Sequence, residues 1–452
     1  MSRSRGALRP AANEEESVMA KQVKNGGLTR RTFMVRSLAT GASVAALGSP
    51  LRAFGAGGKV TLQFWKFAAE NDDPVIRDAV KRWNDAHPDI QVNFQTFPPD
   101  QYHGTKLTTA FAAKRGPDIF WISPGAFINY VNNGVAAPVD DIVDKSAYNP
   151  ASIAAVSVRG KMYALPFEME PVALYYRKDV LGKAGIQPPG TWDELLAAAK
   201  ELTAGQQKGI VIEPAPGPYQ NFTWYPFLWS AGGEVVDATS RKSALRSPQA
   251  ASAFDLWGKL VRQGYAPGRV PTLTADSGPL GRGETAMQVC GFWAIAQLKA
   301  NFPSVEYGIV RIPTPAGGKP VTVYGGWTQM INALGKAVPQ AEAFTKWLWT
   351  EDKTFPQEWA CRHNSKFSPN NAINEQCADV FDTPPYSIFK NEILPTARAE
   401  PRYPDQVVKA VGDGLQAAMF SGKSGEEAAA LAAGKIDAYL STYKGAPLNP
   451  ST

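Results

Sequence analysis

KVTLQFWKF, residues 59–67, alternates between apolar and polar side chains and is rich in β-forming residues, so it predicts a first strand. Apolar residues then recur at helical spacing over 74–86, and a second strand is predicted over 89–97. A second helix over 102–114 leads into a third strand at 117–121. Strands and helices that alternate at this pace predict βαβ units and a mostly parallel sheet.

A second series of the same kind follows. Strands are expected over 161–166 and 171–177, and Thr191 to Glu194 (TWDE) has the capping-box pattern that opens a helix. The later predicted elements are strands near 209–213 and 233–236, helices over 248–263, 291–300, 339–350, 404–420 and 425–443, and a strand–Gly-Gly–strand unit over 320–332. The order predicts an α/β fold with two lobes and helical decoration, without internal repeats.

Composition is that of a globular protein large enough for more than one lobe. The chain has 452 residues, of which 44% are hydrophobic and 19% charged. Nine of the 47 basic residues and three of the 41 acidic ones lie in 1–56, so this segment alone carries the formal net charge of +6. Because the remainder is neutral overall, the charge gives no reason to expect nucleic-acid binding.

The first 56 residues have the order of an export signal. The twin arginines Arg30 and Arg31 precede Phe33, a weakly apolar run follows over 37–51, and small residues at 53–55 offer a cleavage site. The run is shorter than the ~20 residues that a membrane-spanning helix needs. The segment resembles signals of the twin-arginine translocation (Tat) route, so we expect it to be cleaved and the protein to be periplasmic or extracytoplasmic.

Three cysteines lie in the exported part. A bridge between Cys361 and Cys377 would close a loop of about sixteen residues in a compartment that permits disulfides. Three buried thiols are the alternative, and Cys290 is expected to be a small core residue. The three histidines are scattered and no cysteine–histidine pair has ligand spacing, so we predict no metal and no cofactor.

Catalytic motifs are missing. The sequence has no Gly-x-Ser-x-Gly elbow, Gly-rich phosphate loop, His-Glu-x-x-His or dinucleotide-binding glycine pattern. Glu168 and Glu170 are candidates for a glycosidase pair, but in an extended segment they share one face and cannot flank a scissile bond. We therefore predict no catalytic residues and no enzyme activity, with a secreted carbohydrate-active enzyme as the remaining alternative.

Tryptophans are plentiful, and several lie where predicted strands end. Indole rings offer a flat apolar face that fits the C–H face of a pyranose, while carboxylates and amides bind its hydroxyls. Tryptophans favoured as sugar contacts because of this placement are Trp65, Trp121, Trp293 and Trp327. Tryptophans on predicted helix faces, expected in the core, are Trp83, Trp257, Trp347 and Trp349.

Several motifs occur together in a specific order: GPDI over 116–119, GKMYALP over 160–166, LYYRKD over 174–179, PPGTWDEL over 188–195 and GGW over 325–327. With them, the chain resembles extracellular solute-binding proteins of family 1, the maltose-binding-protein-like sugar receptors of ABC importers. The resemblance implies two hinged α/β lobes that close on a carbohydrate. It also implies a monomer that delivers this ligand to the transmembrane subunits of an ABC permease.

The resemblance further implies boundaries and site residues. Lobe 1 is expected over 59–167 plus 326–385 and lobe 2 over 168–325 plus 386–446, with hinges near 167–170, 324–327 and 384–392. The ligand-binding residues implied in lobe 1 are Trp65, Glu70, Asp118, Trp121 and Ser123. Those implied at the hinges and in lobe 2 are Glu168, Glu170, Trp224, Tyr225, Trp293, Gly326, Trp327 and Tyr403.

The identity of the solute stays open at this point. The loop after Trp65 is less polar than a maltose site suggests, and the family includes binders of polyols, glycerol phosphodiesters and other non-sugar solutes. An anionic ligand would need basic residues in the cleft, for which Lys66, Lys366 and Arg398 are the candidates. Each of the three is expected to be a solvated surface charge instead.

Overall fold

The computed structural model describes residues 58–69, 72–239, 241–271, 274–363 and 365–449. The predicted export signal over 1–56 and the predicted ligand contact Glu70 lie outside these ranges. Within them, no helix is both long enough and apolar enough to cross a membrane.

The first sheet has five strands in the order β2-β1-β3-β12-β6. Its strands are β1 (Val60–Phe67), β2 (Ile90–Phe97), β3 (Ile119–Ile122), β6 (Leu165–Pro166) and β12 (Thr328–Ile331). The first three pair in parallel, as the alternating pattern predicts, and β12 joins β3 in antiparallel fashion. Helix α1 (Asp73–Ala86) buries Val75, Ile76, Ala79, Val80 and Trp83, the apolar stripe of its sequence.

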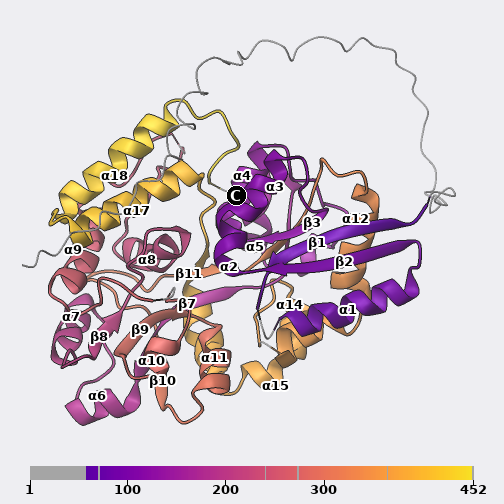
Figure 1. The fold of residues 1–452 in the computed structure, drawn as a ribbon. Helices are drawn as coiled ribbons and strands as arrows, with labels where there is room; N and C mark the ends of the chain where they lie inside the picture. The colour runs from indigo at the N-terminus through magenta and orange to yellow at the C-terminus, as the bar shows by residue number, and fades with distance from the viewer. Residues whose placement is uncertain (1–57, 70–71, 240, 272–273, 364, 450–452) are drawn as a thin grey trace, which may run out of the picture. The chain divides into compact units, whose positions relative to one another are not determined.

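The second sheet has six strands in the order β13-β11-β7-β9-β8, with β10 also paired to β7. Its strands are β7 (Glu170–Arg177), β8 (Lys208–Val211), β9 (Thr285–Gly291), β10 (Tyr307–Val310), β11 (Thr322–Gly325) and β13 (Ala397–Ala399). Figure 1 shows this sheet around β7 and β9, apart from the sheet of β1, β2 and β3. The two sheets give the fold two α/β lobes.

Three connections carry the chain between the sheets, of which the longest, residues 332–396, joins β12 to β13, and the other two are short. The first crossing, residues 167–169, joins β6 to β7, and the second crossing, residues 326–327, joins β11 to β12. Gly325 pairs with Glu170 at the ends of β11 and β7, so the two crossings lie beside each other. The lobe and hinge boundaries expected from the resemblance remain predictions around this topology.

The segment that contains Phe367 and Phe381 departs from the expected lobe assignment, whereas Trp359 still packs against Trp121 of the first lobe. Phe367 and Phe381 pack against Phe292, which follows β9 of the second sheet, with ring centroids 4.5 and 6.4 Å apart. The expected boundaries place both in the first lobe. Apolar packing on Phe292 draws this segment to the second sheet before the chain enters β13.

Most predicted helices are present, with small shifts at their ends. Helices of the first lobe and its connections are α2 (Pro99–Gln101), α3 (Leu107–Ala112), α4 (Phe127–Asn132), α5 (Pro150–Ala155) and α12 (Val338–Lys346). Those next to the second sheet are α6 (Lys178–Ala184), α7 (Trp192–Glu201), α8 (Pro218–Ser230), α9 (Pro248–Arg262), α10 (Gly278–Gly281) and α11 (Ala294–Asn301). The remaining ones are α13 (Phe355–Gln357), α14 (Asn371–Gln376), α15 (Ala378–Phe381), α16 (Tyr386–Ile388), α17 (Asp405–Phe420) and α18 (Gly425–Leu440). The capping box predicted at Thr191 and Glu194 is confirmed.

Short irregular elements complete the chain. The two-stranded hairpin is β4 (Ser157–Val158) with β5 (Lys161–Met162). The π-helical turns are Tyr102–Lys106, Trp347–Glu351, Glu358–His363 and Phe389–Ile393, and the 3₁₀ turns are Pro124–Ala126, Lys145–Ala147 and Leu394–Thr396. Helices α9, α17 and α18 pack side by side (Figure 1).

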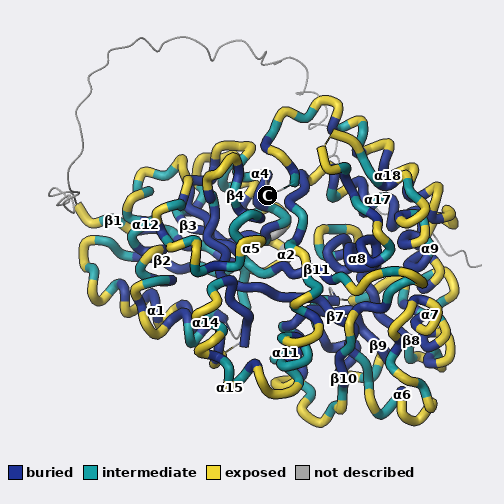
Figure 2. The backbone as a smooth tube through the Cα atoms, turned by 180° about the vertical axis from the view of Figure 1, so that it is seen from behind, coloured by how far each residue is buried: buried dark blue, intermediate teal, exposed yellow. Residues whose placement is uncertain are grey.

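The sequence analysis misses two elements of the second lobe and predicts one strand that is not there. Helix α8 and strand β9 were not predicted, because nearly all their side chains are buried and neither shows an amphipathic period. The strand predicted over 233–236 is wrong, since Val236 makes only an isolated bridge with Ser243. Figure 2 shows α8 and β9 as mostly buried segments.

Candidate functional site

The first crossing brings two carboxylates and a lysine together. Glu170 opens β7 and Glu168 lies two residues earlier, so both side chains face the same way, as their spacing predicts. Lys366 reaches both, with its Nζ 2.9 Å from Glu170 Oε1 and 3.6 Å from Glu168 Oε2. The backbone supports this arrangement, because Met169 N donates to Phe367 O over 2.7 Å.

All three charged groups are buried. Glu168 is 3% exposed, Glu170 4% and Lys366 7%. Burial raises the pKa of both glutamates, and it raises that of Glu168 furthest, although the ammonium of Lys366 opposes the shift. The pKa of Lys366 is raised, because the two carboxylates outweigh the effect of burial on the cation. Trp359 Nε1 donates to Glu168 Oε2 over 3.2 Å.

A second buried cation lies at the end of β1. Lys66 has no exposed surface, and its Nζ lies 2.7 Å from Asp73 Oδ1 and 3.9 Å from Asp72 Oδ2. Burial lowers the pKa of Lys66, while the two aspartates act against that shift. The prediction that Lys66 and Lys366 are solvated surface charges is wrong, because nearby aspartates compensate the first and glutamates from a distant segment compensate the second.

Arg398 does lie at the surface, as predicted. Its Nη1 is 2.7 Å from Glu234 Oε1, and its guanidinium lies 4.3 Å from the centre of the Trp229 ring. Each of the three basic residues considered for an anionic ligand therefore already faces a carboxylate.

Trp121 occupies the core of the first lobe. Its ring is fully buried and lies 4.4 Å from that of Phe167, and its Nε1 donates to Gln329 Oε1 over 3.1 Å. Asp118 is only partly buried, and its Oδ2 accepts from Gln63 N at 2.8 Å. In this arrangement Trp121 offers no ring face to a ligand, which disfavours the predicted stacking role.

Trp65 lies on the opposite face of β1 from Lys66. Its ring packs edge-on against Phe97, with Lys106 Nζ 5.1 Å from its centre. With residues of the helical segment after β2, among them Lys106 and Arg115, it lines a hollow of about 400 Å³. The structure thus separates Trp65 from the carboxylates at the first crossing.

The second crossing combines a glycine with a half-buried indole. Gly326 has φ of 113°, and a Cβ there would lie 2.4 Å from the carbonyl oxygen of Glu168. Trp327 packs against Phe67 at 4.4 Å between ring centroids, and its carbonyl accepts from Phe167 N. Gly326 and Trp327 therefore lie beside the predicted hinge carboxylates.

Several aromatic residues of the second lobe that were expected to bind the ligand are buried. Trp224 is fully buried on α8, where its Nε1 donates to Ala253 O at 3.3 Å, so its predicted contact with a ligand is disfavoured. Tyr225 stacks on Trp229 with 5.5 Å between ring centroids and meets Tyr403 edge-on at 6.3 Å. Tyr225 and Tyr403 pack together and are both buried, so their expected contact with a ligand stays a prediction.

Trp293 is the half-buried indole of the second lobe. It precedes α11, its Nε1 donates to Ala275 O over 2.8 Å, and Tyr219 lies 6.2 Å from its ring. Its partial exposure leaves the predicted stacking role a prediction.

Glu400 is a site candidate that the sequence did not reveal. Its backbone N donates to Tyr324 O in β11, while its buried carboxylate lies against Gly125 and beside Ser123. The contact is close, since a Cβ at Gly125 would lie 2.2 Å from Glu400 Oε1. Burial raises the pKa of Glu400 to about 7. The carboxylate thus joins the second sheet to Ser123, a predicted ligand contact in the first lobe.

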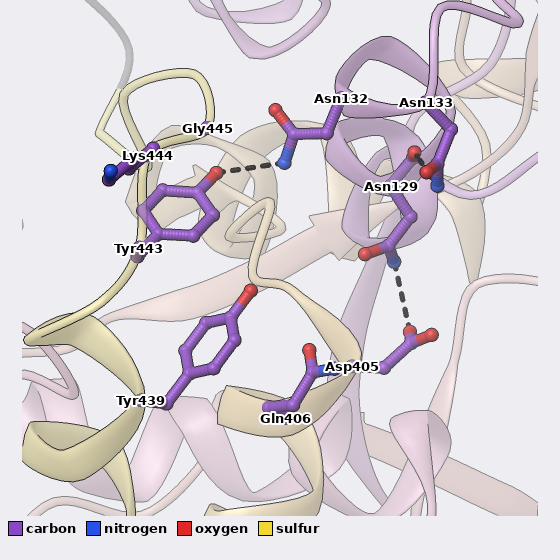
Figure 3. Close-up of a pocket in the computed structure, with 9 residues that line it drawn as sticks. All are labelled: Asn129, Asn132, Asn133, Asp405, Gln406, Tyr439, Tyr443, Lys444 and Gly445. Atoms are coloured by element: carbon purple, nitrogen blue, oxygen red, sulfur yellow. Dashed lines mark hydrogen bonds between the residues drawn. The ribbon is translucent and has the colours of Figure 1, made fainter. Parts of the chain in front are cut away.

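Figure 3 shows a second hollow, of about 460 Å³, between α4 and the ends of α17 and α18. Asn132 Nδ2 donates to Tyr443 Oη and Asn129 Nδ2 to Asp405 Oδ1, both over 2.9 Å. None of the predicted ligand residues lines it.

The cysteines and the possible metal-binding side chains remain to be described. A disulfide joins Cys361 to Cys377, sixteen residues apart, and Cys290 is buried as a free thiol. Within the described part of the chain, no group of three or more histidine, cysteine or carboxylate side chains is placed to hold a metal ion.

Comparison with known proteins supports one family over most of the chain. The family described as bacterial extracellular solute-binding protein matches residues 68–354. A binding protein of Brucella abortus is 28% identical over 417 residues, which cover 89% of this chain and 97% of the relative. The arabinooligosaccharide-binding protein of Halalkalibacterium halodurans is 30% identical over 342 residues, or 70% of this chain and 75% of that one.

A solved structure shows the same fold. The ABC transporter solute-binding protein of Thermotoga lettingae, bound with alpha-D-tagatose, superposes with a TM-score of 0.75 at 23% identity. The match covers 84% of this chain and all of that one. The two-lobed architecture expected from the sequence is confirmed.

Proposed function

Because this chain belongs to the bacterial extracellular solute-binding proteins, we propose that it is the substrate-binding component of an ABC transporter and that its ligand is a carbohydrate. The observation that carries the proposal is the carboxylate pair Glu168 and Glu170 at the crossing between the lobes. Carboxylate oxygens accept hydrogen bonds from hydroxyl groups, and those bonds are strong where water is excluded.

Aromatic surfaces near the crossings supply the apolar part of sugar recognition. Trp327 and Trp293 are half-buried, one in each lobe, and Phe67 lies against the first of them. Indole faces pack against the C–H face of a sugar ring. Relatives support a carbohydrate, because one is an arabinooligosaccharide-binding protein and a structural neighbour holds alpha-D-tagatose.

An anionic solute such as a glycerol phosphodiester has less support. The buried lysines Lys66 and Lys366 each face two carboxylates, and Arg398 faces Glu234. A free anion would have to compete with these carboxylates for the cations. A polyol shares the hydroxyl groups of a sugar and belongs in the same binding screen.

A catalytic role also lacks a geometric basis. Glu168 and Glu170 lie on one strand and converge on the same lysine, so they do not face each other across a space for a scissile bond. We infer that the protein binds its ligand without converting it and delivers it to a permease as a monomer outside the cytoplasm. Export by the Tat route is part of the same proposal.

A thermal-shift screen tests the proposed function. The purified protein is heated with monosaccharides, disaccharides, oligosaccharides, polyols and phosphodiesters. A ligand that binds only the folded state adds ~2.7 kcal/mol at a hundredfold excess over Kd. A raised midpoint with a sugar that chromatography then recovers intact is the expected result. Shifts with phosphodiesters alone, or conversion of the sugar, would contradict it.

A further inference from the structure

A disulfide-closed loop holds Lys366 at the first crossing. The bridge between Cys361 and Cys377 closes the loop that contains it. The next residue, Phe367, forms a backbone bridge with Met169 and packs its ring 4.5 Å from that of Phe292. The position of the lysine is therefore fixed by backbone pairing, apolar packing and a covalent link, each independent of its charge.

The lysine enters a buried cluster that contains more acids than bases. The ionisable side chains in it are Lys66, Asp72, Asp73, Glu168, Glu170 and Lys366. Four are acidic and two are basic, and the groups that act on Glu168 are Lys366, Glu170, Asp72 and the indole of Trp359. An isolated carboxylate is costly to bury, so the cations are what make this arrangement tolerable.

One buried carboxylate oxygen in the cluster lacks a hydrogen-bond donor among the described residues. Glu168 Oε1 is buried and has no hydrogen-bond partner among the described residues, whereas its Oε2 accepts from Trp359. Glu170 Oε1 is already engaged by Lys366. A buried acceptor without a partner gains most from a ligand that brings a donor.

We propose that Lys366 is a positioning residue that holds Glu168 and Glu170 as an acceptor pair, so that the site takes solutes with hydroxyl or ammonium donors and rejects acidic ones. The inference rests on the proposed function and specifies the ligand class of the same site. A carboxylate on the ligand would meet four acids and two lysines in a poorly solvated region, which like-charge repulsion disfavours. Neutral sugars and amino sugars are accepted, and uronic acids are not.

The role of Lys366 has a signature that packing alone does not produce. Without its cation, burial would raise the pKa of Glu168 and Glu170 further above the unfolded values. A carboxyl group whose pKa is higher in the folded than in the unfolded state stabilises the fold at low pH. That contribution is lost as pH rises through the folded-state pKa. Removing Lys366 should therefore lower the free energy of unfolding more at high pH than at low pH.

The first experiment compares Lys366→Met with the matched control Lys346→Met, whose parent side chain is half exposed and 3.8 Å from Glu351. Unfolding midpoints are measured without ligand from pH 4.5 to 8.5. We expect Lys366→Met to lie about 5 °C or more below wild type at pH 8.5 and to approach it at pH 4.5. The control should stay near wild type throughout. A gap for Lys366→Met that does not change with pH would overturn the proposal.

A second variant covers the case in which Lys366→Met does not fold. Adding Glu168→Gln and Glu170→Gln removes the uncompensated charges, so the triple variant should fold and have a higher unfolding midpoint than Lys366→Met at pH 8.5. A triple variant that is as unstable as the single one would assign Lys366 a packing role only, and would overturn the proposal.

The ligand preference is tested with matched sugars. Glucose, glucosamine and glucuronic acid, with the corresponding galactose series, are compared by thermal shift at pH 7.5. For each series that raises the midpoint, the neutral or amino form should bind at least tenfold more tightly than the uronic acid. A uronic acid that equals its neutral parent overturns the preference. If no sugar shifts the midpoint, the carbohydrate proposal fails, and the pH-dependent gap still decides the role of Lys366.

Discussion

The two short crossings between the sheets differ in the kind of side chain that they carry. The crossing at 167–169 is flanked by buried charge, with Glu168 and Glu170 held by Lys366. The crossing at 326–327 has no charged residue and consists of a glycine and a tryptophan. The first is suited to bind polar groups, whereas the second allows close approach and offers an aromatic surface.

The difference matters because the crossings touch. The backbone of Glu168 occupies the space where a side chain at Gly326 would begin, and Phe167 N donates to Trp327 O. The uncharged crossing therefore helps to fix where the carboxylates lie. Variants that alter one crossing should show how far the other depends on it.

The largest effect is expected from Gly326→Ala. Its φ of 113° is strained for an alanine, and the new Cβ would lie 2.4 Å from Glu168 O, which is backbone and cannot turn away. Strain and overpacking together should lower the free energy of unfolding by about 4 kcal/mol. Chemical denaturation measures it.

The matched control is Gly134→Ala, at a glycine with φ of 66° and open space around the missing Cβ. It should cost only about 1 kcal/mol, the conformational term alone. Equal losses at both glycines would mean that the crossings are not in close contact.

Opening the disulfide should weaken the charged crossing. Replacing Cys361 and Cys377 by alanine releases the loop that carries Lys366. For a loop of this length we expect a loss of about 3 kcal/mol in the free energy of unfolding. Wild type treated with a reductant should match the double variant, and an unchanged midpoint in both would contradict the importance of the loop.

Glu400 provides a pH-dependent test next to the uncharged crossing. Its pKa in the folded state, about 7, exceeds the ordinary value of 4.5, so its protonated form stabilises the fold. That stability is present below pH 4.5 and is lost as pH rises through about 7. Glu400→Gln should therefore be more stable than wild type at pH 8, by no more than about 3 kcal/mol, and similar at pH 4.5. Thermal unfolding of both proteins across this pH range measures the difference. If the Glu400 carboxylate were solvated, the variant would have no stability advantage at pH 8.

The smallest change in stability is expected from Trp327→Ala. Because the indole is half-buried, its loss should cost about 1 kcal/mol in folding. Loss of the stacking face should weaken sugar binding by about 1.5 kcal/mol, roughly tenfold in Kd. Calorimetry on the best ligand measures the second effect, and unchanged affinity would remove Trp327 from the site.

The sequence predicts local features of this protein well, because local spacing determines them. The alternation in β1, the apolar stripe of α1 and the shared face of Glu168 and Glu170 all follow from the periods of strands and helices. The order of the predicted elements indicated two α/β lobes, and the family resemblance added the hinge between them.

Long-range compensation is what the sequence could not show. Lys366 can be buried because it pairs with Glu170. The two residues are 196 positions apart in the chain, and no local pattern connects them. Trp121 ends a predicted strand, and Trp224 lies between two predicted strands. Neighbours from distant segments nevertheless enclose both rings. Helix α8 was missed because it is buried on all sides and lacks a polar face.

The most direct test of the account is titration calorimetry of Glu170→Gln with the sugar that gives the largest thermal shift. Glu351→Gln, at an exposed carboxylate, is the matched control. If the charged crossing binds the ligand, wild type and control should bind one sugar per chain, and Glu170→Gln should bind it at least tenfold more weakly, the loss of about 1.5 kcal/mol expected for a charged hydrogen bond. Equal affinity for all three proteins would contradict the central claim that the carboxylates at the first crossing form the sugar site.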